Sequence, residues 1–269
     1  MHAFAYHRPE TLEAAASLRA GAPDGAYLAG GMTLIPTLKQ GLAQPSDLID
    51  LGGLLPGLAG IRVESGALII GAMTRHADVA ASSEVRGAIP ALADLAGQIG
   101  DRQVRNRGTI GGSLANADPA ADYPAAVVAL GAAIVTDRRT IKGDAYFKDL
   151  FETALEPGEL IREVVFPLPR RAAYRKFPNP ASRYAVVGVF VADVGGSVRV
   201  GVTGAGPCAF RWAALEAALA RDLGPAALDA VPIDHTRFNR DLHASAEYRA
   251  QLVKVMAKRA LADMLSQPA

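Results

Sequence analysis

Cysteine is almost absent from this 269-residue chain, which contains only Cys208. One thiol cannot make an internal disulfide, a structural zinc site or an iron–sulfur cluster, because each of these needs several soft ligands. An excess of charge of either sign is also missing, since 28 Lys and Arg residues face 27 Asp and Glu residues. Nucleic-acid backbones and anionic membranes attract a clear cationic excess, so the balance excludes both as the main partner.

Long apolar runs are missing as well, so the sequence predicts neither a membrane span nor a signal peptide. Glycine and proline are frequent, with 27 and 17 residues, but they form no low-complexity tract. The five histidines show no metal-binding spacing, and we expect surface or helix-capping positions for them. The sequence therefore predicts a cytoplasmic protein of two domains or one large domain, with no metal centre of its own.

Short apolar segments alternate with helical patterns along the chain, which indicates an α/β or α+β architecture. Helices are expected at 9–19, 32–39, 74–81, 90–99, 123–130, 212–220 and 248–264, and strands at 26–29, 48–51, 67–70, 184–191 and 198–202. The basic segment 101–107 is expected to be a solvated loop, or, beside a phosphate-binding turn, to screen cofactor charge or meet a partner subunit. In the last helix, the spacing predicts a buried stripe that begins at Tyr248. Two prolines and two arginines near 167–171 predict a domain boundary.

Two segments place adjacent glycines directly before a helical pattern, Gly30-Gly31 and Gly111-Gly112. Glycine lets successive backbone N–H groups converge on one point, because it tolerates positive φ and has no Cβ to obstruct a ligand. Hydroxyl groups accompany both pairs, at Thr33, Thr109 and Ser113. The pattern is typical of phosphate binding, and two tight structural turns are the alternative.

Two other motifs compete for a functional role. Ser113 nearly fits the nucleophile elbow of α/β-hydrolases, but that elbow follows a buried apolar strand, and residues 102–107 are polar. Gly204 and Gly206 fit a dinucleotide fingerprint, although Pro207 removes a donor where the pyrophosphate would need one. We interpret the second motif as a structural strand–turn–helix connection.

Taken with their surroundings, the two glycine segments resemble the FAD-binding medium subunit of molybdenum hydroxylases, in particular the carbon monoxide dehydrogenase type. The resemblance covers almost the whole chain. It is carried by residues 29–36, 99–115, 118–122, 176–182, 184–188, 203–207 and 244–249. The chain departs from the family pattern at Met32, where relatives often have His or Gln, and at Arg102, where proline is common.

The resemblance implies an α+β fold with an FAD-binding domain of the vanillyl-alcohol-oxidase (PCMH) type and a smaller C-terminal α/β domain. The expected boundaries are 1–170 for the FAD-binding domain, with subdomains of about 1–55 and 56–170, and 171–269 for the C-terminal domain. A strand is expected at 159–166. The resemblance also implies that Gly204 and Gly206 do not bind the flavin.

Carried over by position, the resemblance implies a set of cofactor-binding residues and no catalytic residue beyond the flavin. The set comprises Leu28, Ala29, Gly30, Gly31, Met32, Thr33, Leu34, Ile35, Ile99, Thr109, Ile110, Gly111, Gly112, Ser113, Asp122, Ile161, Lys176 and Tyr184. Within it, 28–35 and 109–113 would hold the pyrophosphate and ribityl chain, and Asp122 the nucleotide part. Tyr184 would lie against the isoalloxazine, with an ordinary half-buried tyrosine as the alternative.

The implied activity is that of an oxidoreductase subunit that passes electrons from [2Fe–2S] clusters through FAD to an external acceptor. The implied partners are a large subunit with a molybdenum–pterin cofactor and a small subunit with two [2Fe–2S] clusters, assembled as a dimer of heterotrimers. Because the chain has only one cysteine, the [2Fe–2S] clusters are expected on another chain. Two alternatives stay open at this point, a cofactor-free scaffold of the same fold and a serine hydrolase that uses Ser113.

Overall fold

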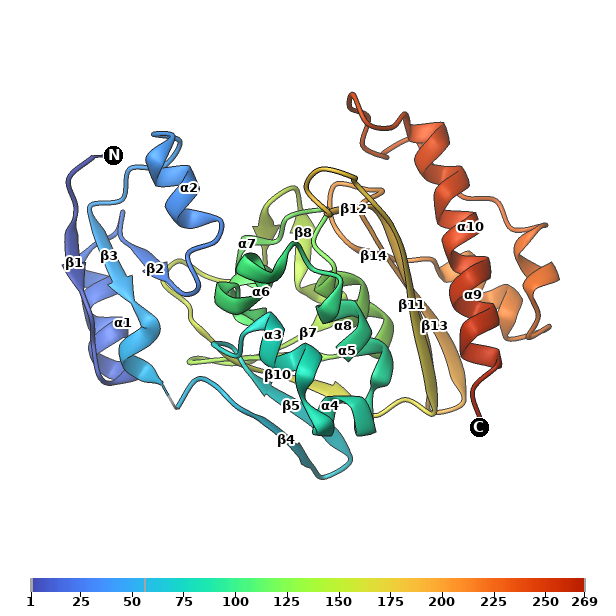
Figure 1. Ribbon diagram of the computed structural model, residues 1–269, viewed down its shortest axis with the longest axis horizontal. Helices are drawn as coiled ribbons and strands as arrows, with labels where there is room; N and C mark the ends of the chain where they lie inside the picture. Colours follow the sequence, from blue (N-terminus) through green and yellow to red (C-terminus); the bar gives the residue numbers. More distant parts are fainter. Residues whose placement is uncertain (1, 56, 269) are drawn as a thin grey trace.

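The computed structural model describes residues 2–55 and 57–268, which form three main sheets arranged along the longest axis of the molecule (Figure 1). A three-stranded parallel sheet comes first, a five-stranded antiparallel sheet lies in the middle, and a four-stranded antiparallel sheet follows. Helices and strands are interleaved throughout, which confirms the predicted α+β class. No helix within the described residues has the length and apolar character needed to cross a membrane.

The first sheet has the order β1-β3-β2, and its strands are parallel. Parallel neighbours cannot be joined by a tight hairpin, so α1 and α2 supply the connections. Thr11 begins α1 by accepting the backbone N–H of Ala14 at 3.1 Å. The elements are β1 (Ala5–His7), α1 (Leu12–Gly21), β2 (Ala26–Leu28), α2 (Leu34–Lys39), β3 (Asp47–Asp50) and the 3-10 helix η1 (Leu51–Leu54).

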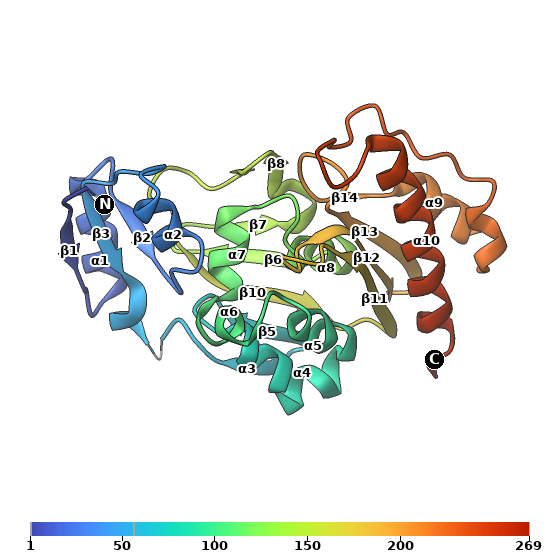
Figure 2. The same ribbon diagram turned by 45° about the horizontal axis from the view of Figure 1, so that its top comes forward.

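The middle sheet has the order β4-β5-β10-β6-β7, and six helices pack together beside it (Figure 2). Its strands are β4 (Ile61–Glu64), β5 (Ala67–Gly71), β6 (Ala133–Thr136), β7 (Thr140–Lys142) and β10 (Ile161–Pro167). The helices are α3 (His76–Ala81), α4 (Ser83–Ala88), α5 (Pro90–Gly97), α6 (Arg102–Arg107), α7 (Ile110–Asn116) and α8 (Tyr123–Leu130). All eight residues of α8 are buried, so this helix forms the centre of the molecule. A 3-10 helix η2 (Gly143–Ala145) and the pair β8 (Phe147–Asp149) and β9 (Glu152–Thr153) complete the region.

The third sheet has the order β11-β12-β13-β14 and is covered on both faces, by α8 and by α10. Nine of the ten residues of β12 are buried as a result. The backbone of Gly201 approaches the Ala125 carbonyl of α8 so closely that a Cβ there would lie 2.1 Å from the oxygen. The elements are β11 (Arg171–Pro178), β12 (Ala185–Val194), β13 (Ser197–Thr203), β14 (Phe210–Arg211), α9 (Ala213–Leu219), the 3-10 helix η3 (Pro225–Leu228) and α10 (Ala246–Leu265).

Two local predictions were wrong. Residues 102–107 form α6 rather than a loop, because Asp101 provides an N-cap by accepting the Val104 N–H at 2.8 Å. Tyr248 does not belong to the buried stripe of α10, since it is 46% exposed and packs edge-on against Phe177. By contrast, the structure confirms the bounds predicted for α8 and the buried positions of Met256 and Ala260.

Candidate functional site

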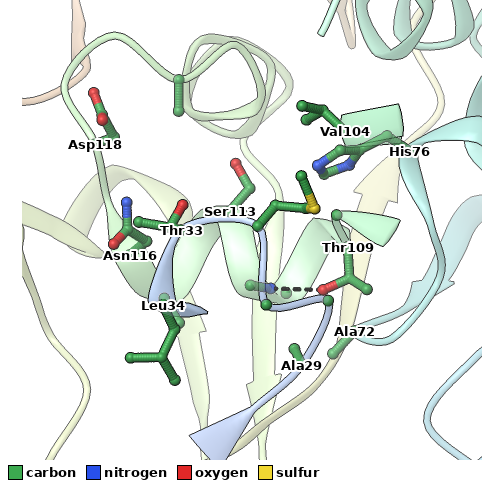
Figure 3. Close-up of a pocket in the computed structure, with 18 of the residues that line it drawn as sticks. Ala29, Thr33, Leu34, Ala72, His76, Val104, Thr109, Ser113, Asn116 and Asp118 are labelled. Carbon is green, nitrogen blue, oxygen red and sulfur yellow. Dashed lines mark hydrogen bonds between the residues drawn. The ribbon is translucent and has the colours of Figure 1, made fainter. Parts of the chain in front are cut away.

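The loop between β2 and α2 leaves a row of backbone donors without protein partners. Gly31 turns the chain at φ +76°, and Thr33 begins α2 without a side-chain cap. Within the described residues, no backbone or side-chain acceptor bonds to the N–H groups of residues 30–34. These five consecutive N–H groups border a cavity of about 540 Å³ (Figure 3). Successive unpaired N–H groups in such a turn are suited to holding an anion.

The second glycine segment meets the first through close backbone packing. A Cβ on Gly30 would lie 2.0 Å from the Arg107 carbonyl oxygen, so only glycine permits this approach. Gly111 is equally confined, because its Cβ would lie 2.6 Å from the Cβ of Ala72. Gly30 therefore sets the spacing between the first glycine loop and the end of α6, and Gly111 sets the spacing between α7 and the residue that follows β5.

Most N–H groups of the second segment, unlike those of the first, already have partners inside the protein. Ile110 and Gly111 donate to the carbonyls of Thr74 and Ala72, at 3.1 and 2.8 Å. Gly112 donates to the Thr109 hydroxyl at 3.1 Å, which is the bond drawn in Figure 3. The two segments were expected to act alike, but the first offers a row of free backbone donors, whereas in the second only the Thr109 N–H lacks an acceptor within the described residues. The second contributes the hydroxyls of Thr109 and Ser113.

Most of the sequence-predicted site residues line this one cavity. They are Ala29, Gly30, Gly31, Met32, Thr33, Leu34, Ile99, Thr109, Gly111, Gly112, Ser113, Asp122, Ile161 and Tyr184. Four predicted residues, Leu28, Ile35, Ile110 and Lys176, do not line it. Ile110 is fully buried, and Leu28 and Ile35 pack next to the Gly31 backbone. Tyr184 is 43% exposed, so its ring lies at the edge of the cavity.

Asp122 and Lys176 form a buried ion pair behind the cavity wall. The Lys176 Nζ donates to Asp122 Oδ1 at 2.8 Å and to the Gln98 carbonyl at 2.9 Å. The Tyr174 hydroxyl donates to the same Asp122 oxygen at 2.6 Å. The two charged side chains are only 3% and 2% exposed. Burial raises the pKa of Asp122, and the charge of Lys176 opposes that shift. Lys176 does not line the cavity itself, and its contribution to the cavity wall is the ion pair with Asp122.

Glu159, another residue of the cavity wall, has all its acceptor positions engaged. Arg139 donates to both of its oxygens, at 3.0 and 2.9 Å, while the Thr136 hydroxyl and the Glu156 N–H add further bonds. The hydrogen bonds from Arg139 are the main reason that the pKa of Glu159 falls to about 2. An ionised, fully bonded carboxylate supports the wall and is not available as a proton donor or acceptor near neutral pH.

Sequence reasoning missed several residues of the cavity. His76, expected at the surface or at a cap, is only 5% exposed and lines it. Tyr27, Asn116 and Asp118 also line it. Asn116 and Asp118 adjoin the second glycine segment, so their proximity was a usable signal. His76 lies far away in the sequence, and no local pattern marks it.

Neither competing motif gains support from the structure. Ser113 lies inside α7, and the helix α6 precedes it, whereas a nucleophile elbow requires a strand followed by a sharp turn. Gly204 donates its N–H to the Pro119 carbonyl at 2.7 Å, and neither it nor Gly206 lines the cavity. The fingerprint at 204–209 is therefore a structural turn. The cavity, with its five free N–H groups, suits an elongated ligand that carries a pyrophosphate.

Comparison with known proteins agrees with this geometry. Residues 2–169 match the family described as "FAD binding domain in molybdopterin dehydrogenase". The chain belongs to this family. It is 36% identical to the carbon monoxide dehydrogenase medium chain of Hydrogenophaga pseudoflava, over 96% of both chains. It is also 36% identical to the 6-hydroxypseudooxynicotine dehydrogenase complex subunit alpha of Paenarthrobacter nicotinovorans, over 97% of this chain and 94% of that one.

Solved structures extend the similarity to the whole fold. The carbon monoxide dehydrogenase of Hydrogenophaga pseudoflava matches with a TM-score of 0.89 at 34% identity, covering 100% of this chain and 99% of that one. The reconstituted CO dehydrogenase from Oligotropha carboxidovorans matches with a TM-score of 0.91 at 31% identity, covering 99% of each. The predicted family and fold are confirmed. This chain is an FAD-binding, electron-transfer subunit of the molybdenum-hydroxylase type.

Proposed function

We propose that the cavity described above is the FAD site of this subunit, with the pyrophosphate held by the backbone N–H groups of residues 30–34. The observation that carries the proposal is the row of five donors without protein acceptors at the cavity wall. Gly30, Gly31 and Leu34 are half-buried, where N–H groups normally have partners, so their free donors indicate a ligand. Thr33 and Ser113 add hydroxyls at the same wall (Figure 3).

Bound FAD supplies the conversion between single-electron input from the clusters and electron-pair delivery to an acceptor. The chain's own contribution is to bind and orient the dinucleotide. Ile99, Ile161 and Tyr184 give the cavity apolar and aromatic walls that exclude water from a ring system. Substrate oxidation belongs to the large subunit in this proposal, so the chain itself contains no substrate site.

For the assembly, we propose one copy of this chain with one large molybdenum-binding and one small [2Fe–2S] subunit, in a dimer of such heterotrimers. The medium-chain and subunit names of the relatives support a multi-subunit complex. Native mass spectrometry of the co-purified complex should give a mass equal to two copies of each subunit. A mass equal to one copy of each would contradict the dimeric arrangement.

We also propose that the three sheets mark the units expected from the sequence, at about 1–55, 56–170 and 171–269. The first sheet ends at Asp50, the middle sheet spans residues 61 to 167, and the third sheet begins at Arg171. The cavity lies where the first two units meet, since most residues of 26–34 and of 108–113 line it. FAD would therefore hold these two units together.

Placing a carboxylate beside the proposed pyrophosphate tests the site. Thr33 is exposed and its side chain meets only the Tyr184 hydroxyl as a hydrogen-bond partner in the described residues, so Thr33→Glu should leave the apoprotein's stability within about 0.5 kcal/mol. Repulsion between the new charge and the phosphates should weaken FAD binding by roughly two orders of magnitude, as measured by flavin fluorescence quenching. The uncharged variant Thr33→Gln is the matched control and should bind within a few-fold of the unaltered chain. Equal affinity of the two variants would contradict the assignment.

A further inference from the structure

His76 is a buried residue of the cavity wall that has no role in the FAD site proposed above. It is the first residue of α3, and its backbone N–H donates to the Gly108 carbonyl at 2.9 Å. The edge of its ring lies along the Gly108 backbone, because a Cβ on Gly108 would lie 2.6 Å from Nε2 and 2.8 Å from Cδ2. These contacts fix the imidazole in the cavity wall, where Figure 3 shows it facing the enclosed space.

Nδ1 of His76 is buried without a hydrogen-bond partner, and no group within the described residues bonds to Nε2. Burial, and to a smaller degree the charge of Arg105, lowers the pKa of His76 to about 4, so the imidazole is neutral. A neutral imidazole has one N–H donor and one acceptor nitrogen. Because Nδ1 is sealed inside the protein, only Nε2 is available to a group that enters the cavity.

Within the described residues, the neighbouring polar groups form no hydrogen bond with the ring. Arg105 donates to the carbonyls of Ile99 and Gly100, at 2.9 and 3.0 Å. Tyr123 packs against the imidazole with ring centroids 5.4 Å apart, but its hydroxyl is itself buried and without a partner. Tyr123 does not line the cavity. The space that remains next to the ring is the cavity itself.

The position of the ring also indicates which nitrogen faces that space. Nδ1 is sealed within the protein. Nε2 lies on the opposite edge, against Gly108, and Gly108 itself lines the cavity. Gly108 touches the first glycine segment as well, because a Cβ on Gly30 would lie 2.9 Å from the Gly108 Cα. Nε2 is thus separated from the row of free N–H groups by the width of a single glycine.

We propose that His76 is a cofactor-binding residue whose Nε2 forms a hydrogen bond with an oxygen of the pyrophosphate–ribityl part of FAD. This assignment rests on the proposed FAD site and adds a side chain from α3 to it. The neutral imidazole acts as a hydrogen-bond partner and adds no charge. It therefore fixes the position of the dinucleotide along the wall between the two glycine segments.

Three substitutions in the full chain test the proposal, with FAD affinity measured by fluorescence quenching. His76→Phe keeps an aromatic ring but removes both nitrogens, and it should weaken FAD binding about five- to tenfold. A glutamine amide can reach the position of Nε2, so His76→Gln should bind within about twofold of the unaltered chain. An asparagine amide reaches only the position of Nδ1, so His76→Asn should lose as much affinity as His76→Phe.

Urea unfolding of the FAD-free proteins separates binding from a structural role. Because His76 has no partner in the free chain, His76→Phe should leave its stability unchanged or raised. Tyr123→Phe removes the adjacent unpartnered hydroxyl and is the matched control, which should keep full FAD affinity. Unchanged affinity of His76→Phe with lowered stability would overturn the proposal, as would full affinity of His76→Asn with weak binding by His76→Gln. An unaltered chain that binds no FAD would overturn the proposed site as a whole.

Discussion

Gly30→Ala should abolish measurable FAD binding and lower the free energy of unfolding by about 3 kcal/mol. The new Cβ would lie 2.0 Å from the Arg107 carbonyl oxygen and 2.7 Å from the carbonyl carbon. Both are backbone atoms between α6 and the second glycine segment, so no side-chain rotation can relieve the overlap. The first glycine loop must move away from Gly108, which displaces the five N–H groups from the cavity wall.

Gly87→Ala is the matched control for this substitution. Gly87 lies within α4, and a Cβ there would meet no atom within 4 Å. Alanine is the better helix former, so this variant should be as stable as the unaltered chain or up to about 1 kcal/mol more stable, with full FAD affinity. Flavin absorbance after FAD addition and gel filtration, together with urea unfolding, measures both effects. Stoichiometric FAD in Gly30→Ala would contradict the role given to the first glycine loop.

The roles of the two glycine segments show where sequence reasoning succeeds and where it stops. Adjacent glycines predicted both segments, and both lie at the cavity, although Gly111 and Gly112 lie within α7 and not before it as expected. Whether a backbone N–H is free depends on carbonyls supplied by distant residues. Ala72 and Thr74 precede the second segment by more than thirty residues and occupy its donors. No local pattern contains that information.

Other missed features have the same origin. The run of charges over residues 102–107 suggested a solvated loop, but one N-cap from Asp101 suffices for the short helix α6. His76 becomes a cavity residue only because α3 begins where its N–H meets the Gly108 carbonyl. By contrast, α8 is apolar over its whole length and ends at Gly131, so its bounds were predictable from the residues alone.

Lys176→Met should lower the free energy of unfolding by about 3–5 kcal/mol at pH 7, the usual cost of removing one partner of a buried ion pair. Methionine fills a similar volume but cannot donate to Asp122, which is 3% exposed. The Tyr174 hydroxyl would remain as a donor to Asp122 Oδ1, at 2.6 Å, yet it carries no charge. The cost therefore comes from a carboxylate left buried without its cation.

The pH dependence of this cost identifies Asp122 as its source. Burial already raises the pKa of Asp122 against the opposing charge of Lys176, so loss of the lysine should raise it further. A carboxyl group whose pKa is raised in the folded protein binds its proton there more tightly than in the unfolded chain, so stability increases as the pH falls through that raised pKa. Urea unfolding should therefore show a smaller difference between Lys176→Met and the unaltered chain at pH 5 than at pH 7.

The double variant Asp122→Asn with Lys176→Met is the control for this effect. An asparagine leaves no charge to bury, so the double variant should be more stable than Lys176→Met alone at pH 7, with little change between pH 7 and pH 5. A cost for Lys176→Met below about 1 kcal/mol, or one that does not vary with pH, would contradict the ion pair as a buried support of the cavity. The expected result would show that β11, outside the family-matched residues 2–169, stabilises the wall of the proposed FAD site through one lysine.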